Sequence, residues 1–263
     1  MDYSTILWDV TDGVATITLN RPDRLNSFTE AMHSELRLAL DRIETPGVAR
    51  VLVITGAGRG FSAGQDLADA TTGGDARNFD AASSLERNYN TMLARLRALP
   101  MPVIAAVNGV AAGASANIAL ACDLVIAARS ATFLQAFARI GLIPDAGGTY
   151  TLVRRVGMQR AMGLSMLAEP LPAQTAADWG LIWKCVDDDQ FAAEVAALAR
   201  KLASGPTRAY ALMKQAIHAG ADNTFDEQLK LEVALQREAG GSDDFREGVA
   251  AFLGKRPAVF SGR

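Results

Sequence analysis

The sequence has little histidine and little cysteine, and these two scarcities exclude several kinds of site. Its 263 residues include two His and two Cys. Cys122 and Cys185 are too few for a disulfide-stabilised scaffold and form no C-x-x-C pair, so we expect a reducing, cytoplasmic compartment. His33 and His218 stand apart, and we expect both on the surface. No His, Cys and carboxylate residues cluster at ligand spacing, so we expect neither a metal site nor a Ser-His-Asp triad.

The sequence has no excess of one charge, and we expect no secretion signal from its first residues. Lys and Arg total 26 against 29 Asp and Glu, for a formal charge of -3, and there is no run of five like charges. This balance argues against nucleic acid or a membrane surface as a partner. The N-terminal residues Met-Asp-Tyr-Ser-Thr contain neither a basic nor an apolar segment, so they do not predict a secretory signal.

The longest stretch without a charged side chain runs from Ala98 to Cys122, long enough to raise the question of a membrane span. It contains proline, asparagine and glycine, and much of its apolarity is alanine, which contributes little to membrane insertion. We therefore interpret it as buried protein interior. With 49% hydrophobic residues, the chain can bury one large core, with or without an appended helical piece.

The hydrophobic pattern predicts an α/β chain. Residues 14–19 alternate after Asp12-Gly13, which predicts an opening β-hairpin. Helical spacing runs from Thr29 to Ile43, and the apolar run 50–55 is typical of a strand buried on both faces. Further elements are expected as strands at 103–107 and 124–128, and as helices at 113–121, 190–203, 206–219, 224–239 and 242–253.

Two other segments invite a functional reading. The polar residues 68–84 predict a mobile surface loop of a length that often forms a lid. The stretch Gly58-Arg-Gly-Phe-Ser-Ala63 fits the G-x-G-x-x-A fingerprint of dinucleotide-binding enzymes, and Tyr210 with Lys214 has the spacing of the catalytic pair of short-chain dehydrogenases. We interpret both matches as accidental, because about fifty residues precede these glycines and no apolar helix follows them.

The segment from Ala111 to Asn117 enters a helix through small residues. Small side chains let a ligand approach the backbone, and a helix N-terminus presents unpaired N–H groups with a partial positive charge, which suits an oxyanion. If the Gly64-Gln65 turn supplies another N–H, two donors converge on one carbonyl oxygen and stabilise an enolate. The alternative is that the small residues only allow close helix packing.

Three motifs, in this order, resemble the crotonase, or enoyl-CoA hydratase/isomerase, superfamily over essentially the whole chain. The motifs are Phe61-Ser-Ala-Gly-Gln-Asp-Leu67, Ala105-Ala-Val-Asn-Gly109 through Cys122-Asp123, and Gly141-Leu-Ile-Pro-Asp-Ala-Gly-Gly-Thr149. The resemblance implies a crotonase-type spiral of ββα units with the CoA and acyl site in residues 1–200, and a helical C-terminal trimerisation region in residues 201–263. It implies an acyl-CoA substrate that itself carries the coenzyme A, no prosthetic group, and a homotrimer or a homohexamer built as a dimer of trimers.

The same resemblance assigns expected roles to individual residues. By position, the backbone N–H groups of Gln65 and Ala114 form the oxyanion hole for the thioester carbonyl. Asp66 and Asp123 stand where the family keeps structural aspartates. The expected CoA-binding residues are Arg24, Ala63, Gln65, Asp66, Leu67 and Lys255, the last across a subunit contact. The expected acyl-pocket residues are Tyr89, Asn117 and Phe137.

Departures from the hydratase pattern narrow the expected activity. Hydratases of this family have two catalytic glutamates, and the resemblance places Asn117 and Phe137 at their positions, where neither can transfer a proton. Asp145 is then the one carboxylate near the motifs without an evident structural role. Burial beside Phe137 would raise its pKa, which suits a reversible proton carrier. The alternative is that Asp145 caps the helix that runs through residues 149–153.

Within the superfamily, segments such as Gly56-Ala-Gly-Arg-Gly-Phe and Gly141-Leu-Ile-Pro-Asp are similar to the ring-epoxide isomerases of phenylacetate catabolism. This similarity implies an isomerase that converts 2-(1,2-epoxy-1,2-dihydrophenyl)acetyl-CoA to oxepin-CoA and shifts enoyl-CoA double bonds from the β,γ to the α,β position, as in fatty acid metabolism. The alternatives are an enoyl-CoA hydratase, a non-catalytic CoA-binding protein, and an aryl-CoA dehalogenase. In the last of these an Asp matching Asp145 attacks the ring, but a His base and a Trp are also needed.

Overall fold

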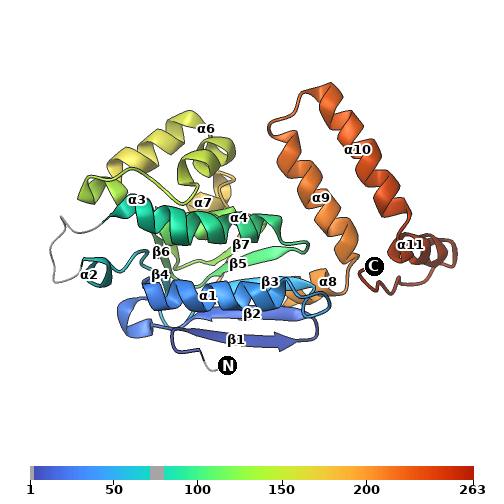
Figure 1. Cartoon of the computed structure of the whole chain (residues 1–263), viewed down its shortest axis with the longest axis horizontal. Helices are drawn as coiled ribbons and strands as arrows, with labels where there is room; N and C mark the ends of the chain where they lie inside the picture. Colours follow the sequence, from blue (N-terminus) through green and yellow to red (C-terminus); the bar gives the residue numbers. More distant parts are fainter. Residues whose placement is uncertain (1–2, 72–79) are drawn as a thin grey trace.

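Two β-sheets form the centre of the computed structural model, which describes residues 3–71 and 80–263 (Figure 1). The larger sheet has six strands, in the order β1 (Ile6–Thr11), β2 (Val14–Leu19), β3 (Val51–Gly56), β5 (Val103–Val107), β7 (Leu124–Ala128) and β10 (Lys184–Val186). The smaller sheet has four, in the order β4 (Gly60–Ser62), β6 (Val110–Ala112), β8 (Thr132–Leu134) and β9 (Leu171–Pro172). The β1–β2 and β8–β9 pairs are antiparallel, and the other pairs are parallel.

Helices follow these strands in a repeating order. Three times a strand of the larger sheet precedes a strand of the smaller sheet and then one or more helices: after β3–β4, after β5–β6 and after β7–β8. These are the ββα units that the family resemblance implies. The helical segments are η1 (Pro22–Arg24), α1 (Glu30–Ile43), α2 (Leu67–Ala70), α3 (Ala81–Ser84), η4 (Leu85–Asn90), α4 (Thr91–Ala98), α5 (Ala114–Ala121), η5 (Ala136–Ile140), α6 (Gly148–Leu167), α7 (Ala173–Asp178), α8 (Phe191–Ala203), α9 (Thr207–Gly220), α10 (Phe225–Gly240) and α11 (Asp243–Leu253).

Local sequence signals account for the ends of several elements. Asp12 and Gly13 both have positive φ, 51° and 76°, as a tight two-residue hairpin requires. Thr29 caps α1 by accepting a hydrogen bond from the Met32 N–H at 3.3 Å, and Thr224 forms the capping box of α10 with Glu227. The structure confirms several predicted elements: the hairpin, the buried β3 strand, α5, β7 and the four C-terminal helices.

The glycine-rich stretch after β3 enters β4 of the second sheet rather than a long helix. A Cβ at Gly56 would lie 2.2 Å from the Gly60 carbonyl oxygen, so this glycine permits close strand contact. This confirms that the dinucleotide-type match is accidental. Of the predicted loop 68–84, residues 68–70 and 81–84 are helical, and residues 72–79 lie outside the described part of the chain.

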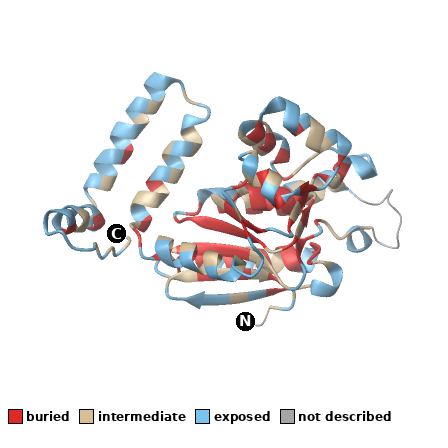
Figure 2. Ribbon diagram, turned by 180° about the vertical axis from the view of Figure 1, so that it is seen from behind, coloured by how far each residue is buried: buried red, intermediate tan, exposed pale blue. Residues whose placement is uncertain are grey.

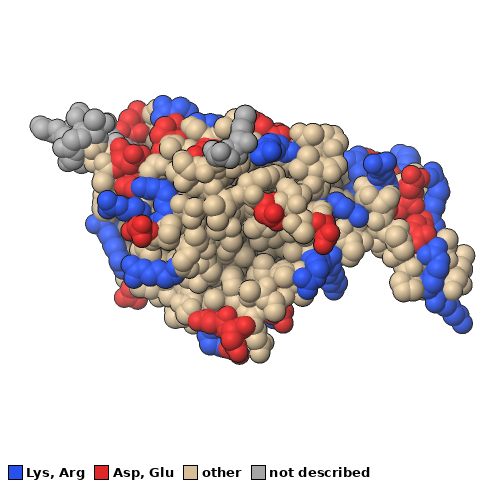
Figure 3. Space-filling view, turned by 90° about the horizontal axis from the view of Figure 1, so that it is seen from below, with Lys and Arg blue, Asp and Glu red and all other residues tan. Residues whose placement is uncertain are grey.

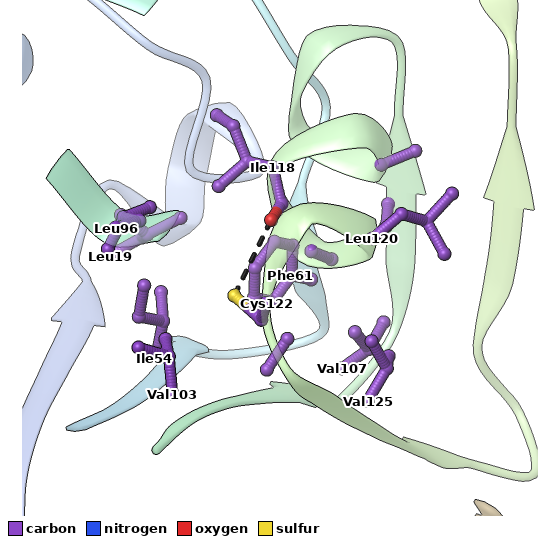
Figure 4. Packing of buried hydrophobic residues seen from close by; sticks show 14 of the residues in the cluster. Leu19, Ile54, Phe61, Leu96, Val103, Val107, Ile118, Leu120, Cys122 and Val125 are labelled. Atoms are coloured by element: carbon purple, nitrogen blue, oxygen red, sulfur yellow. Dashed lines mark hydrogen bonds between the residues drawn. The ribbon is translucent and has the colours of Figure 1, made fainter. Parts of the chain in front are cut away.

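The uncharged run forms the centre of the core. All five residues of β5 are buried, and so are seven of the eight residues of α5. Figure 4 shows Ile118 and Leu120 of α5 among Ile54, Val107 and Val125 of the large sheet. The Cys122 thiol donates to the Ile118 carbonyl at 3.5 Å, and burial raises its pKa to about 12. The interpretation as protein interior is confirmed, and no helix among residues 3–71 and 80–263 is long and apolar enough to cross a membrane.

The C-terminal helices follow the core in sequence and extend from it (Figures 1 and 2). Ala199 and Ala203 of α8 pack on Val51 and Ile104 of the large sheet. α9 and α10 run side by side beyond this layer, and α11 lies at the end of the molecule opposite α2. Lys214 of α9 ties this region to the core through an ion pair of 2.8 Å with Asp123. The division at residue 200 and the role of the region in trimerisation stay predictions.

One face of the molecule carries side chains of both charges. On the face shown in Figure 3, basic and acidic side chains are interspersed around a broad uncharged area. This mixture fits a chain whose formal charge is only -3, and on this face it presents no field of one sign to a polyanion.

Candidate active site

The first predicted oxyanion donor, the N–H of Gln65, lies in a short parallel bridge to Phe28. The Phe28 N–H donates to the Gly64 carbonyl at 2.8 Å, and the Asp66 N–H donates to the Phe28 carbonyl at 2.9 Å. In such a bridge the residue between the two bonds directs its own N–H to the opposite side. The Gln65 N–H is therefore turned away from Phe28.

The second predicted donor is the N–H of Ala114, the first residue of α5. The N–H groups of a helix's first turn have no acceptor within the helix. Gly113 enters the helix at φ 57° and ψ -132°, a conformation that a side chain strongly disfavours. The Ser115 hydroxyl stabilises this turn because it donates to the Ser62 carbonyl at 2.6 Å and accepts from the Ala112 N–H at 3.1 Å.

Gly64 lets the two turns approach each other. Its φ is +89°, and a Cβ there would lie 2.7 Å from the Ala112 carbonyl oxygen and 3.7 Å from the Ala114 nitrogen. The backbone before Gln65 thus lies directly against the N-terminus of α5. The structure brings Gln65 and Ala114 together, and their role as donors to a thioester oxygen stays a prediction.

Asp145 lies in the turn between η5 and α6 and has a buried carboxyl oxygen. Within the described part of the chain, its Oδ1 atom has no hydrogen-bond partner. Burial raises the pKa of Asp145 to about 6. The alternative role as a helix cap is wrong: Gly147 is the N-cap residue of α6, and no side chain caps that helix.

Asn117, on α5, holds the backbone of Asp145. Its Nδ2 donates to the Asp145 carbonyl oxygen at 2.8 Å, and its Oδ1 accepts from Gln135 Nε2 at 2.8 Å. Both amide side chains belong to buried residues. Asn117 is therefore a neighbour of Asp145, as a pocket residue should be, but both ends of its amide are already engaged.

Tyr89 is hydrogen-bonded to Gln65, and its pKa responds to the charge of Asp145. Its hydroxyl donates to Gln65 Oε1 at 2.7 Å, and Gln65 Nε2 donates to the Phe28 carbonyl at 3.2 Å. Burial and, second, the negative charge of Asp145 raise the pKa of Tyr89 well above its ordinary value. The structure therefore brings Gln65, Tyr89 and Asp145 into one site, and the phenol stays neutral.

Phe137 packs against the entrance to α5. The residue is buried in η5, and a Cβ at Gly113 would lie 3.9 Å from its ring atom Cζ. Phe137 thus lies next to the Ala114 turn. Neither Phe137 nor Asn117 can exchange a proton near neutral pH. Of these two residues and Asp145, Asp145 is therefore the one that can act as an acid or a base.

Five of the predicted CoA-binding residues lie in two adjacent segments. The Ala63 N–H donates to the Leu25 carbonyl at 2.9 Å, which brings the exposed Arg24 beside the strand end that leads to Leu67. Asp66 has a structural role, since it pairs with Arg21 at 2.9 Å and caps α2. Lys255 follows α11 at the opposite end of the molecule (Figure 1), so within one chain it is remote from this site.

The sequence-based predictions missed two residues that support the site and misplaced a third. Gln135 and Ser115 were not singled out, because they support the site through hydrogen bonds to segments distant in sequence, to Asn117 and to the Ser62 carbonyl. His33 was predicted on the surface and this is wrong: it is buried, with its ring 4.5 Å from that of Tyr89. Burial lowers its pKa to about 4. The signal was available, since His33 shares the helical spacing of Leu36, Leu40 and Ile43.

The second histidine and the acidic residues do not form a further centre. His218 is half-buried on α9, 4.0 Å from Asp123. Throughout residues 3–71 and 80–263, no three His, Cys, Asp or Glu side chains lie close enough to hold a metal ion.

Comparisons with known proteins show what this chain is similar to. A model of the enoyl-CoA hydratase/isomerase family matches residues 9–263. The chain is 53% identical to the 1,2-epoxyphenylacetyl-CoA isomerase of Escherichia coli (strain K12), over 98% of each chain. It is 51% identical to a probable enoyl-CoA hydratase of Rhodobacter capsulatus over the full length of both.

A solved structure matches the whole fold. The enoyl-CoA hydratase from Bacillus anthracis superposes with a TM-score of 0.92 and 33% identity, covering 99% of this chain and 100% of that one. The superposition confirms the predicted α/β fold class, with its two sheets and C-terminal helices.

Proposed function

Because this chain belongs to the enoyl-CoA hydratase/isomerase family, we propose that it is an acyl-CoA isomerase with Asp145 as its acid/base. The observation that carries the proposal is the buried Oδ1 of Asp145, which has no hydrogen-bond partner among the described residues. The pKa of this carboxyl group, about 6, lies near physiological pH. A group with such a pKa can both accept and return a proton. The 53% identity to a 1,2-epoxyphenylacetyl-CoA isomerase supports a ring-epoxide thioester as substrate.

The proposed reaction moves one proton along the acyl chain. The Asp145 carboxylate removes a proton from the carbon next to the thioester, and the C–H electrons pass to the carbonyl oxygen. The N–H groups of Gln65 and Ala114 hold that enolate oxygen, each worth roughly 3 kcal/mol in the transition state. The protonated Asp145 then returns the proton to the γ carbon, which yields the α,β-unsaturated thioester. In 2-(1,2-epoxy-1,2-dihydrophenyl)acetyl-CoA the carbon–carbon bond shared by the epoxide and the six-membered ring breaks while both C–O bonds are kept, so the ring expands to the seven-membered oxepin. The same proton transfer, from the carbon next to the thioester to a ring carbon, then yields oxepin-CoA.

Hydration is the less favoured reaction because it needs a second proton-transfer group to activate a water. The site offers Asn117, whose amide is bonded at both ends, and Phe137, which is apolar. Dehalogenation needs a histidine base. The ring of His33 packs against the ring of Tyr89, and by the family resemblance Phe137 occupies the position where that chemistry needs a Trp.

The experiment is product analysis after incubation with a 3-enoyl-CoA and with the ring-epoxide thioester. We expect an isomer of unchanged mass; the hydrate, heavier by one water, identifies a hydratase, and an unchanged substrate identifies a pure binder. Asp145→Asn should lower kcat by about a hundredfold or more, since it removes the general acid/base. Asp178→Asn, the same change at an exposed residue of α7, is the matched control. A wild-type rate in Asp145→Asn contradicts the proposal.

We also propose that the chain works as a homotrimer or a dimer of trimers. Exposed apolar side chains on the C-terminal helices support this: Ile217, Phe225, Val233, Phe252 and Leu253 are each more than half exposed. An apolar surface of this kind usually marks a protein contact. Lys255 follows these helices, so a subunit contact is the route by which it would reach a CoA phosphate on a neighbouring chain.

A further inference from the structure

We infer that Asn117 and Gln135 are positioning residues for Asp145: a directed chain of two buried amides holds the peptide that carries the acid/base carboxylate. The inference rests on the proposed role of Asp145 and deepens it. It assigns no proton transfer to either amide.

The Asp145 carbonyl oxygen fixes the direction of the two hydrogen bonds. The Asp145 carbonyl oxygen can only accept, so Asn117 must direct its NH2 group toward it. The Asn117 oxygen then faces Gln135, which must in turn present its own NH2 group. Both bonds measure 2.8 Å, and Asn117 and Gln135 are 1% and 4% exposed. Water therefore competes little with either bond, and each amide has a single favourable orientation.

The turn after Asp145 needs this support. Ala146 and Gly147 follow with φ of 47° and 74°, so two successive residues adopt the left-handed conformation, and one of them carries a Cβ that disfavours it. The Asp145 carbonyl accepts a second bond, from the Gly148 N–H at 2.8 Å. One donor thus comes from α5 and the other from the start of α6.

Packing leaves Asn117 no other position. A Cβ at Gly148 would lie 2.3 Å from Asn117 Nδ2 and 2.6 Å from its Cγ, so the first turn of α6 rests directly on the amide. Loss of the amide would free the Asp145 turn without touching the exposed segments at Arg24 and Leu67. The effect should therefore fall on kcat rather than on KM.

The test is a double-mutant cycle in the full-length enzyme with a 3-enoyl-CoA as substrate. Asn117→Leu keeps the branched shape of the side chain, with a larger volume, and removes the donor; we expect kcat to fall about tenfold or more while KM stays within about threefold. Gln135→Leu should lower kcat by a smaller factor, and the double variant should be no worse than Asn117→Leu alone, because both act through one chain. Ile118→Val, at a buried residue of the same helix, controls for loss of stability and should keep the wild-type kcat.

Two outcomes overturn the inference. One is an Asn117→Leu enzyme with kcat within about twofold of wild type; the other is a double variant in which the two losses multiply. If Asn117→Leu does not fold, Gln135→Leu carries the test, and an unchanged kcat in that variant overturns the inference. An active Asp145→Asn enzyme overturns the proposed function instead, whereas an inactive Asp145→Asn beside a fully active Asn117→Leu overturns the positioning role alone.

Discussion

At the scale of single residues, Asp145 combines a chemical property with a cost in stability. Its pKa rises from 3.8 to about 6 because burial disfavours the charged carboxylate. Between these values the folded state binds more protons than the unfolded state, so stability falls as pH rises through this window. Above about pH 6 the full cost is present, at most about 3 kcal/mol for a shift of this size.

Asp145→Asn should therefore stabilise the protein at high pH while it removes activity. Near pH 8 we expect the free energy of unfolding to rise on the order of 1–3 kcal/mol, because a neutral amide replaces a buried charge. Near pH 4 the gain should be much smaller, since the folded state already holds the proton. Urea unfolding at both pH values measures the difference, and Asp178→Asn should show none. A variant less stable than wild type near pH 8 would contradict this account of the carboxylate.

His33 shows which sequence signal best predicts whether a residue is buried. His33 was predicted on the surface because of its polar neighbours Ser34 and Glu35, yet it shares the helical phase of Leu36 and Leu40, which face the core. The helical period was the better guide in this case. The motif around Asp145 made it a catalytic candidate from the sequence. That Asp145 does not cap α6 could not be predicted in this way, because it depends on Gly147, which takes the N-cap position with a positive φ.

At the scale of elements, local rules predicted most of the fold. The Asp12-Gly13 hairpin, the Thr29 cap and the Thr224–Glu227 capping box each depend on residues within a few positions of one another, and each is present. The approach of the Gly64 turn to the start of α5 is different. It joins segments about fifty residues apart, for which no local periodicity exists.

Gly64→Ala tests whether this approach matters for catalysis. The φ of +89° disfavours alanine by roughly 1–2 kcal/mol, and the added Cβ would also displace the Ala112 carbonyl. We expect lower stability and a kcat reduced about tenfold or more, because the two proposed donors, the N–H groups of Gln65 and Ala114, separate. Gly47→Ala is the matched control: its φ is +87° and nothing lies within 4 Å of the added Cβ. Equal kcat in the two variants would show that the Gly64 contact only supports the fold.

At the scale of the whole molecule, contacts between distant segments complete both the fold and the site. Arg50, before β3, donates to Thr207, to the Gly205 carbonyl and to the Phe260 carbonyl, and so joins the large sheet to the C-terminal region. Asn117 reaches Asp145 and Gln135 in the same way. The motifs predicted which segments build the site, but the hydrogen bonds between them follow only from the folded chain.

The pH dependence of wild-type kcat/KM for a 3-enoyl-CoA tests the central claim that one carboxylate with a raised pKa moves the proton. The ionised form of Asp145 must accept the first proton, so kcat/KM should be level from about pH 8 to about pH 7. Below about pH 6 it should fall tenfold per pH unit, as protonation of a single group requires. A profile that stays level down to about pH 4.5, or one that falls a hundredfold per unit as two coupled groups would produce, contradicts the account.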